Sequence, residues 1–282
     1  TQVVDEIESR FFGELTRTTG NVFLGMTIEF IGNGKVAITT PQHIDEALED
    51  FGETINESVV NPAKSKLFQV NTVSPRLDHS RSDKFHSISA KLLWVCKRSR
   101  PDVETAVAFL CTRQQVSTEE DWKKLRRVLA FIKCTKNDRR IMGTNDLLTL
   151  EIWIDAAYAI HSNMRSQTGG AMSFGWGLVQ GKSSVQKLNT KSSTETEVVG
   201  VSDYVSHPIL MINFMEHQGY YMNKRVLYQD NESAIKMEKN GRNSCTGNSR
   251  HIDIRYFFVM YDGGYDFYAI HCAINNFLRP LL

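Results

Sequence analysis

The sequence predicts an α/β protein of the α+β type, with a helical middle and a mixed sheet in its C-terminal half. Apolar residues recur at helical spacing between residues 85 and 132. From Leu150 the pattern changes to short β-branched and aromatic runs. These runs follow the order β-β-β-α-β-α, which predicts a three-stranded meander and a crossover that places the fourth strand parallel to the first.

Length and composition allow substantial cores but say little about partners. The 282 residues, 41% of them apolar, are enough for two domains. The net charge is only +1, yet residues 1–60 hold 3 basic and 11 acidic side chains, whereas residues 81–140 hold 15 basic and 7 acidic ones. The basic segment could cover a phosphate backbone, and solvated helix faces explain it equally well.

Cysteine usage and hydropathy indicate an intracellular protein. The five cysteines are far apart and form no CxxC pair, which predicts a reducing setting and no zinc site. The absence of a signal peptide and of an apolar run near 18 residues predicts no membrane segment. The chain starts with Thr1 rather than Met, so we expect it to be part of a longer protein.

The N-terminal part reads as a hairpin followed by helices. Residues 21–31 and 35–39 predict two strands joined at Gly32-Asn33-Gly34, and Pro41 opens a helix that runs to Phe51. Residues 52–80 read as a linker. Three helices follow, and the third has a capping signal at residues 117–121. One side of that third helix is basic, with Lys123, Lys124, Arg126 and Arg127.

The C-terminal half predicts four strands and three helices. The expected strands are residues 150–159, 168–175, 182–188 and 225–230, and the expected helices are residues 193–219, 232–240 and 252–261. Pro208 lies inside the long helix, where a proline costs about 3 kcal/mol and kinks the helix.

Three carboxylates stand out. Asp155 lies in the middle of a predicted strand, where β-propensity disfavours it. Glu197 lies near the start of the long helix, and Asp230 ends the strand that the crossover brings beside Asp155. Three acids that meet at one point repel each other without a cation, and hard cations such as Mg²⁺ or Mn²⁺ prefer oxygen ligands.

Other roles for these residues remain open. Glu197 has capping-box spacing with Thr194, Asp230 is a suitable N-cap for the next helix, and Glu195 competes as the ligand on the long helix. The hydroxyls of Ser192, Ser193 and Thr194 would cradle a nucleic-acid phosphate or simply cap the helix, and the two roles are compatible.

Five blocks in a fixed order carry a family resemblance. They are Asp155-Ala-Ala-Tyr-Ala, Arg165-Ser-Gln-Thr-Gly-Gly, residues 187–197, Tyr228-Gln-Asp-Asn-Glu-Ser-Ala-Ile and Arg250-His-Ile-Asp-Ile-Arg-Tyr-Phe-Phe. This order resembles the ribonuclease H domain of copia-type retrotransposon Pol polyproteins. The upstream segments Phe23-Leu-Gly-Met-Thr-Ile-Glu, Ala90-Lys-Leu-Leu-Trp and Arg100-Pro-Asp resemble the reverse transcriptase part of the same polyproteins.

The resemblance implies a ribonuclease H-like fold, with a mixed five-stranded type of sheet and flanking helices. It divides the chain into the end of a reverse transcriptase palm or thumb region with its linker (1–80), a helical connection region (81–148), a ribonuclease H-like domain (149–262) and an atypical tail (263–282). The polymerase acids of the family would lie upstream of Thr1, so polymerase activity is not implied here.

The resemblance also implies a function. Asp155, Glu197 and Asp230 match three metal ligands of a Mg²⁺-dependent endonuclease that cuts the RNA strand of RNA–DNA hybrids. The expected partners are the hybrid, held partly by Lys123, Lys124, Arg126 and Arg127, and the polymerase fingers and palm of the polyprotein. No small-molecule cofactor is expected. The expected location is intracellular, in a cytoplasmic particle or the nucleus.

Two departures keep an alternative open. No segment after residue 259 matches the family's last strand and fourth acidic ligand, for which Asp253 is a candidate stand-in and Asp262 and Asp266 are weaker ones. We therefore expect the last strand to be missing or altered. Together with Pro208, this leaves a catalytically impaired nucleic-acid-binding remnant as the alternative function.

Overall fold

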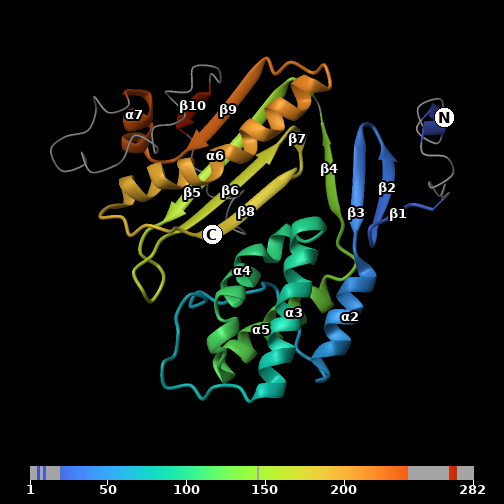
Figure 1. The fold of residues 1–282 in the computed structure, drawn as a ribbon, viewed down its shortest axis with the longest axis vertical. Helices are drawn as coiled ribbons and strands as arrows, with labels where there is room; N and C mark the ends of the chain where they lie inside the picture. Colours follow the sequence, from blue (N-terminus) through green and yellow to red (C-terminus); the bar gives the residue numbers. More distant parts are fainter. Residues whose placement is uncertain (1–4, 7–8, 11–19, 145, 241–266, 272–282) are drawn as a thin grey trace.

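The computed structural model describes residues 5–6, 9–10, 20–144, 146–240 and 267–271 (Figure 1). This part of the chain contains two five-stranded sheets, with strand orders β1-β2-β3-β4-β7 and β10-β9-β5-β6-β8. Helices α2 to α5 form a group beside the first sheet, and α6 crosses the second (Figure 1). No helix in the described ranges combines the length and the hydropathy needed to cross a membrane.

The first sheet begins with the predicted hairpin. Strands β1 (Val22–Phe23), β2 (Met26–Gly32) and β3 (Lys35–Thr39) are antiparallel. Asn33 and Gly34 have positive φ values of 51° and 68°, as a tight turn between twisted strands requires. Strands β4 (Arg140–Thr144) and β7 (Gly175–Trp176) extend this sheet, so it contains strands from both halves of the chain.

The predicted helices share one hydrophobic core. They are α2 (Pro41–Phe51), α3 (His79–Arg98), α4 (Glu104–Thr112) and α5 (Glu119–Cys134). Thr118 and Asp121 form the expected capping box at the start of α5. Residues 52–78 contain no helix or long strand, but Ile55, Leu67 and Leu77 are buried in the same core. The predicted linker is therefore packed against the helices.

The second sheet has the predicted topology. Strands β5 (Thr149–Ala157), β6 (Gln167–Ser173) and β8 (Gln180–Val185) form an antiparallel meander. Helix α6 (Ser193–His217) then crosses over to β9 (Lys224–Gln229), which is parallel to β5, and α7 (Glu232–Asn240) follows. Leu150, Ile152 and Ile154 alternate along β5 into a second core that α6 covers. The division of the chain into four segments stays a prediction.

The sequence predicts a missing or altered last strand, and the structure shows that the strand is not missing. Strand β10 (Tyr268–His271) pairs in parallel with β9 and completes the five-stranded sheet, so the strand is present although it is short. Tyr268 and Ile270 suit a strand. Local sequence pattern does not identify this strand, because the strand that it pairs with lies about 40 residues upstream. The helix expected at residues 252–261 and most of the tail lie outside the described residues.

Buried charges join the two halves. The Glu104 carboxylate is 1% exposed, contacts Lys97 Nζ and accepts a hydrogen bond from the Ser183 N–H at 2.9 Å. The Arg140 guanidinium donates to the carbonyls of Leu178 and Val179 across the same boundary. Because a buried charge is costly unless it is paired, these contacts favour one relative placement of the helices and the second sheet.

Helix α6 continues through Pro208, so we predict that Pro208→Ala stabilises the protein. Pro208 is buried and cannot donate a backbone hydrogen bond to the previous turn. Alanine restores the donor and should add up to about 3 kcal/mol, which raises Tm by several degrees in a thermal melt. Leu210→Ala, at an exposed position of the same helix, is the control and should change Tm little. A Pro208→Ala variant with unchanged or lower Tm would contradict the prediction.

Gly170 on β6 lies directly under Tyr204 of α6, so we predict that Gly170→Ala is destabilising. A Cβ at this position would lie 2.3 Å from Tyr204 Cδ2, and Tyr204 is fully buried. Overpacking of this kind costs about 1–3 kcal/mol in chemical denaturation. In the Tyr204→Leu background, Gly170→Ala should lower the free energy of unfolding clearly less than in the wild type, because the Tyr204 ring that the new Cβ meets is absent. Equal costs in the two backgrounds would argue against this packing.

Candidate metal centre

Three carboxylates that are far apart in the sequence meet at one edge of the second sheet. Asp155 comes from β5, Glu197 from the first turns of α6, and Asp230 directly follows β9. One carboxylate oxygen from each residue lies within 4.8 Å of the other two. Glu197 is 5% exposed, Asp155 is half-buried and Asp230 is exposed, so the group opens to solvent on the Asp230 side.

The register of the sheet and a close helix approach bring these residues together. Trp153 pairs with Tyr228 in the parallel β5–β9 ladder, so Asp155 and Asp230 each lie two residues further along neighbouring strands. Gly200 faces β5 one turn after Glu197, and a Cβ at Gly200 would lie only 3.3 Å from Ala156 Cβ. The glycine therefore lets α6 lie close enough for Glu197 to reach the strand end.

Glu197 takes no part in capping helix α6. The N-cap of α6 is Ser192, whose hydroxyl accepts a hydrogen bond from the Glu195 N–H at 3.2 Å. The Glu195 carboxylate accepts from the Lys191 N–H at 2.8 Å, so Glu195 works in the cap and is not in the carboxylate group. The alternative pairing of Thr194 with Glu197 as the capping box is therefore wrong.

Asp230 takes no part in capping helix α7. The side chain of Asn231 accepts a hydrogen bond from the Ala234 N–H at 3.0 Å and so caps the start of α7. The alternative in which Asp230 is this cap is also wrong. The Asp230 carboxylate points into the group with Asp155 and Glu197 instead.

Burial and crowding disfavour the charged forms of Glu197 and Asp155. Burial, with the negative charges of Asp155 and Asp230, raises the pKa of Glu197 to about 9. Burial, with the charge of Asp230, raises the pKa of Asp155. Within the described ranges no Lys, Arg or His side chain forms an ion pair with any of the three. Three oxygen donors at this spacing without a cationic partner fit a hard divalent cation such as Mg²⁺ or Mn²⁺.

Neutral groups hold two of the carboxylates. The Ala156 N–H donates to Asp155 Oδ1 at 2.8 Å, and Gln229 Nε2 donates to Glu197 Oε2 at 3.3 Å. The sequence reasoning did not single out Gln229. Its only signal was the alternation of β9, which places Gln229 on the same core-facing side as Leu227.

The hydroxyl residues predicted to bind nucleic acid lie at the start of α6, about one turn before Glu197. Ser192 and Ser193 are exposed at the N-terminus of α6, and Thr194 is half-buried. Ser192 Oγ acts as the helix cap. Their contact with a phosphate stays a prediction.

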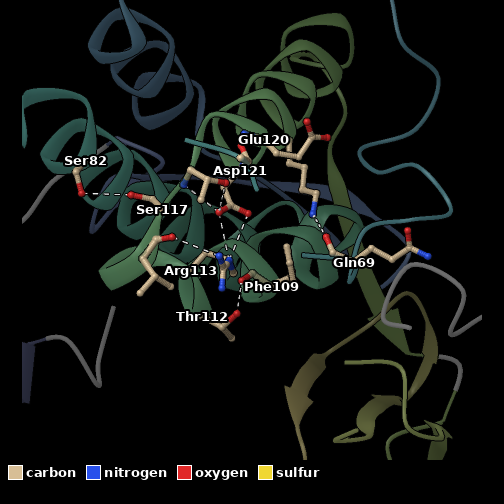
Figure 2. A network of polar contacts seen from close by, with 12 residues as sticks. Gln69, Ser82, Phe109, Thr112, Arg113, Ser117, Glu120 and Asp121 are labelled. Atoms are coloured by element: carbon tan, nitrogen blue, oxygen red, sulfur yellow. Dashed lines mark hydrogen bonds and ion pairs between the residues drawn. The ribbon is translucent and has the colours of Figure 1, made fainter. Parts of the chain in front are cut away.

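Three of the four predicted basic residues of α5 contact the packed 52–78 segment. Lys124 Nζ donates to the carbonyls of Leu67 and Gln69, Arg126 pairs with Glu53 and Glu57, and Arg127 donates to Asn61. Lys123 is paired only loosely, at 3.7 Å from Glu120, and its side chain is 72% exposed. Figure 2 shows part of this network, with Gln69 beside α5 and Arg113 pointing toward Asp121. Nucleic-acid binding by these four residues stays a prediction.

Comparison with known proteins identifies relatives whose matches cover between 57% and 88% of the chain. No family model matches it. The Retrovirus-related Pol polyprotein from transposon TNT 1-94 of Nicotiana tabacum is 24% identical over 260 residues, which cover 88% of this chain and 19% of that protein. The Pol polyprotein from transposon RE1 of Arabidopsis thaliana is 27% identical over 163 residues, 57% of this chain and 11% of that protein. The chain thus spans a fifth or less of these relatives.

A shorter relative and a solved structure agree with these matches. An uncharacterized mitochondrial protein of Arabidopsis thaliana is 28% identical over 176 residues, which cover 62% of this chain and 71% of that protein. A structure of the foamy viral protease-reverse transcriptase dRH in complex with ds DNA has a TM-score of 0.50 at 13% identity, and the match covers 89% of this chain and 38% of that one. At that identity the match shows the fold alone. Together the sequence matches confirm the resemblance seen in the motifs: this chain is related to the retrovirus-related Pol polyproteins of plant copia-type transposons.

Proposed function

We propose that this chain is a metal-dependent endonuclease that hydrolyses the RNA strand of RNA–DNA hybrids as part of a reverse transcriptase polyprotein. The observation that carries the proposal is the meeting of Asp155, Glu197 and Asp230 within 4.8 Å at the end of parallel strands β5 and β9. The kinship with Pol polyproteins supports a role in nucleic-acid processing.

The three acids would hold Mg²⁺ or Mn²⁺. When bound, a pair of such ions supplies an activated water and stabilises the leaving 3′ oxygen of the phosphodiester. Glu197 fixes the buried side of the site, whereas the exposed Asp230 lies where a backbone phosphate can approach from solvent. The Ala156 N–H keeps Asp155 oriented toward its neighbours.

The substrate would be held mainly through its backbone. The exposed hydroxyls of Ser192 and Ser193 at the N-terminus of α6 would contact a phosphate near the cut. Lys123 offers the most accessible charge of the basic side of α5. Recognition of an RNA strand through 2′-hydroxyls and phosphates predicts little sequence preference.

Cleavage of a labelled RNA–DNA hybrid in Mg²⁺ tests the proposal. Asp155→Asn should lower the rate by on the order of 10²-fold or more, because it removes charge that stabilises the reacting phosphate through the metal. Glu151→Gln is the matched control on the same strand, because glutamine can still accept the hydrogen bond from Tyr228 Oη. Its rate should stay near that of the wild type.

Two outcomes would count against the nuclease. Cleavage that survives Asp155→Asn would show that the carboxylate group is not the site of hydrolysis. A folded wild type that does not cut, but binds the hybrid with an affinity that falls steeply with salt, would favour the impaired remnant.

Without metal, the free-energy cost of burying the Glu197 carboxylate should become measurable as a pH dependence of stability. The pKa of Glu197 rises from 4.5 in the unfolded chain to about 9 in the folded one, so the folded state holds the extra proton between these values. Stability is therefore greatest at low pH in this window and falls as pH rises toward 9. In EDTA, the wild-type Tm should fall as the pH rises from 5.5 to 8.5. In Glu197→Gln, the fall in Tm over the same pH range should be smaller by on the order of 5 °C.

Added metal provides the control for this measurement. Mg²⁺ should raise the wild-type Tm at pH 8.5 and leave Glu197→Gln nearly unchanged, because the cation offsets the repulsion only where the carboxylate is present. Parallel pH profiles for the two proteins in EDTA would refute the account of a crowded, buried Glu197.

A further inference from the structure

The Gln229 side chain contacts the Glu197 carboxylate and the backbone of Asp230, which belong to two of the three residues of the carboxylate group. It is the last residue of β9, it is fully buried, and its side chain faces α6. Its Nε2 donates to Glu197 Oε2 at 3.3 Å, and its Oε1 accepts from the N–H groups of Asp230 at 2.8 Å and Asn231 at 3.1 Å. One amide therefore connects the start of α6 to the turn that carries Asp230.

The orientation of this amide follows from its neighbours. Backbone N–H groups can only donate, so the oxygen of Gln229 has to face Asp230 and Asn231. The NH₂ group is then directed at Glu197, where it favours a carboxylate that accepts. A flipped amide would oppose donor to donor on one side and acceptor to acceptor on the other.

We infer that Gln229 is the positioning residue of the carboxylate group, setting Glu197 and Asp230 at the spacing that a divalent cation needs without touching the cation itself. The inference rests on the proposed metal-dependent function. It explains why a polar side chain occupies a core-facing position of β9, next to the buried Leu227.

A second contact fixes the same turn from the other side. The His271 ring donates from Nε2 to the carbonyl oxygen of Asp230 at 3.0 Å. The Asp230 backbone is thus held at its N–H by Gln229 and at its C=O by β10, while its side chain stays directed at Asp155 and Glu197. Gln229 is the part of this arrangement that also reaches Glu197.

A purely structural role makes a different prediction from a positioning role. If Gln229 only ties the turn between β9 and α7, its loss lowers stability and leaves metal affinity alone. If Gln229 positions the acids, its loss weakens metal binding, and the loss depends on Glu197. Residues that orient metal ligands typically change affinity by 10–100-fold when they are replaced.

Two variants separate these roles. Gln229→Asn keeps an amide that can bond locally to the Asn231 N–H in an Asx turn, but it is one methylene too short to span to Glu197. Gln229→Met keeps the length and loses every hydrogen bond. Gln180→Asn is the matched control, because Gln180 bonds Tyr204 Oη at the opposite end of the sheet from Asp155.

Binding of Mn²⁺ alone, followed by the electron paramagnetic resonance signal of the free ion, is the readout, with Tm in EDTA as the measure of folding. Both Gln229 variants should raise the Kd for Mn²⁺ by about 10-fold or more, and Gln180→Asn should leave it unchanged. In the Glu197→Gln background, Gln229→Asn should lower the affinity for Mn²⁺ little further, because the hydrogen bond between Gln229 and the Glu197 carboxylate has already been changed.

The outcomes distinguish this inference from the function on which it rests. A wild type that binds Mn²⁺ through Asp155, with the same Kd in the Gln229 variants, overturns the positioning role and leaves the proposed function standing. Equal losses from Gln229→Asn with and without the Glu197 carboxylate also overturn it. A folded wild type that binds no Mn²⁺ overturns the proposed function and the positioning role together.

Discussion

The repulsion among three carboxylates at the end of β5 and β9 is the constraint around which the second half of the structure is built. Bringing Glu197 into this group requires α6 to lie against β5 at Gly200, and the cap formed by Ser192 and Glu195 stabilises the start of α6. Because the pKa of Glu197 is raised, folding is less favourable when the Glu197 carboxylate is ionised than when it is protonated. Such a local cost is typical of functional sites.

Two other buried acids in the described chain, Glu104 and Asp121, are held differently. Glu104 contacts Lys97 and the Ser183 N–H, and Asp121 pairs with Arg113 while it closes the capping box of α5. Both acids therefore have a cation within the chain. Glu197 is buried to a similar degree, but its neighbours are two further acids and the neutral amide of Gln229. This contrast, more than the presence of acidic residues as such, favours an external cation.

Much of the fold could be predicted from local pattern, because apolar periodicity marks which face of each helix and strand is buried. The alternation along β5 and the crossover to β9 are of this kind. The cap of α6 could not be settled, since Ser192 with Glu195 and Thr194 with Glu197 have the same spacing and differ only in where the helix begins. The partners of Lys124 and Arg126 also escaped prediction, because they lie more than 50 residues away in the chain.

The atypical C-terminal segment and Pro208, the two features that favour an impaired remnant, differ in how they affect the carboxylate group. The unfamiliar C-terminal segment still supplies β10, whose His271 holds the backbone of Asp230, so the sheet edge beside the carboxylates is complete. Pro208 lies 11 residues beyond Glu197, roughly 16 Å along the helix axis. Between them Tyr204 packs on Gly170, which anchors the first half of α6 to β6 before the proline is reached. The hydrogen bond that Pro208 removes is the one to the Tyr204 carbonyl, about two turns beyond Glu197. The position of Glu197 therefore depends on the turns before Tyr204, where Gly200 lies close to β5.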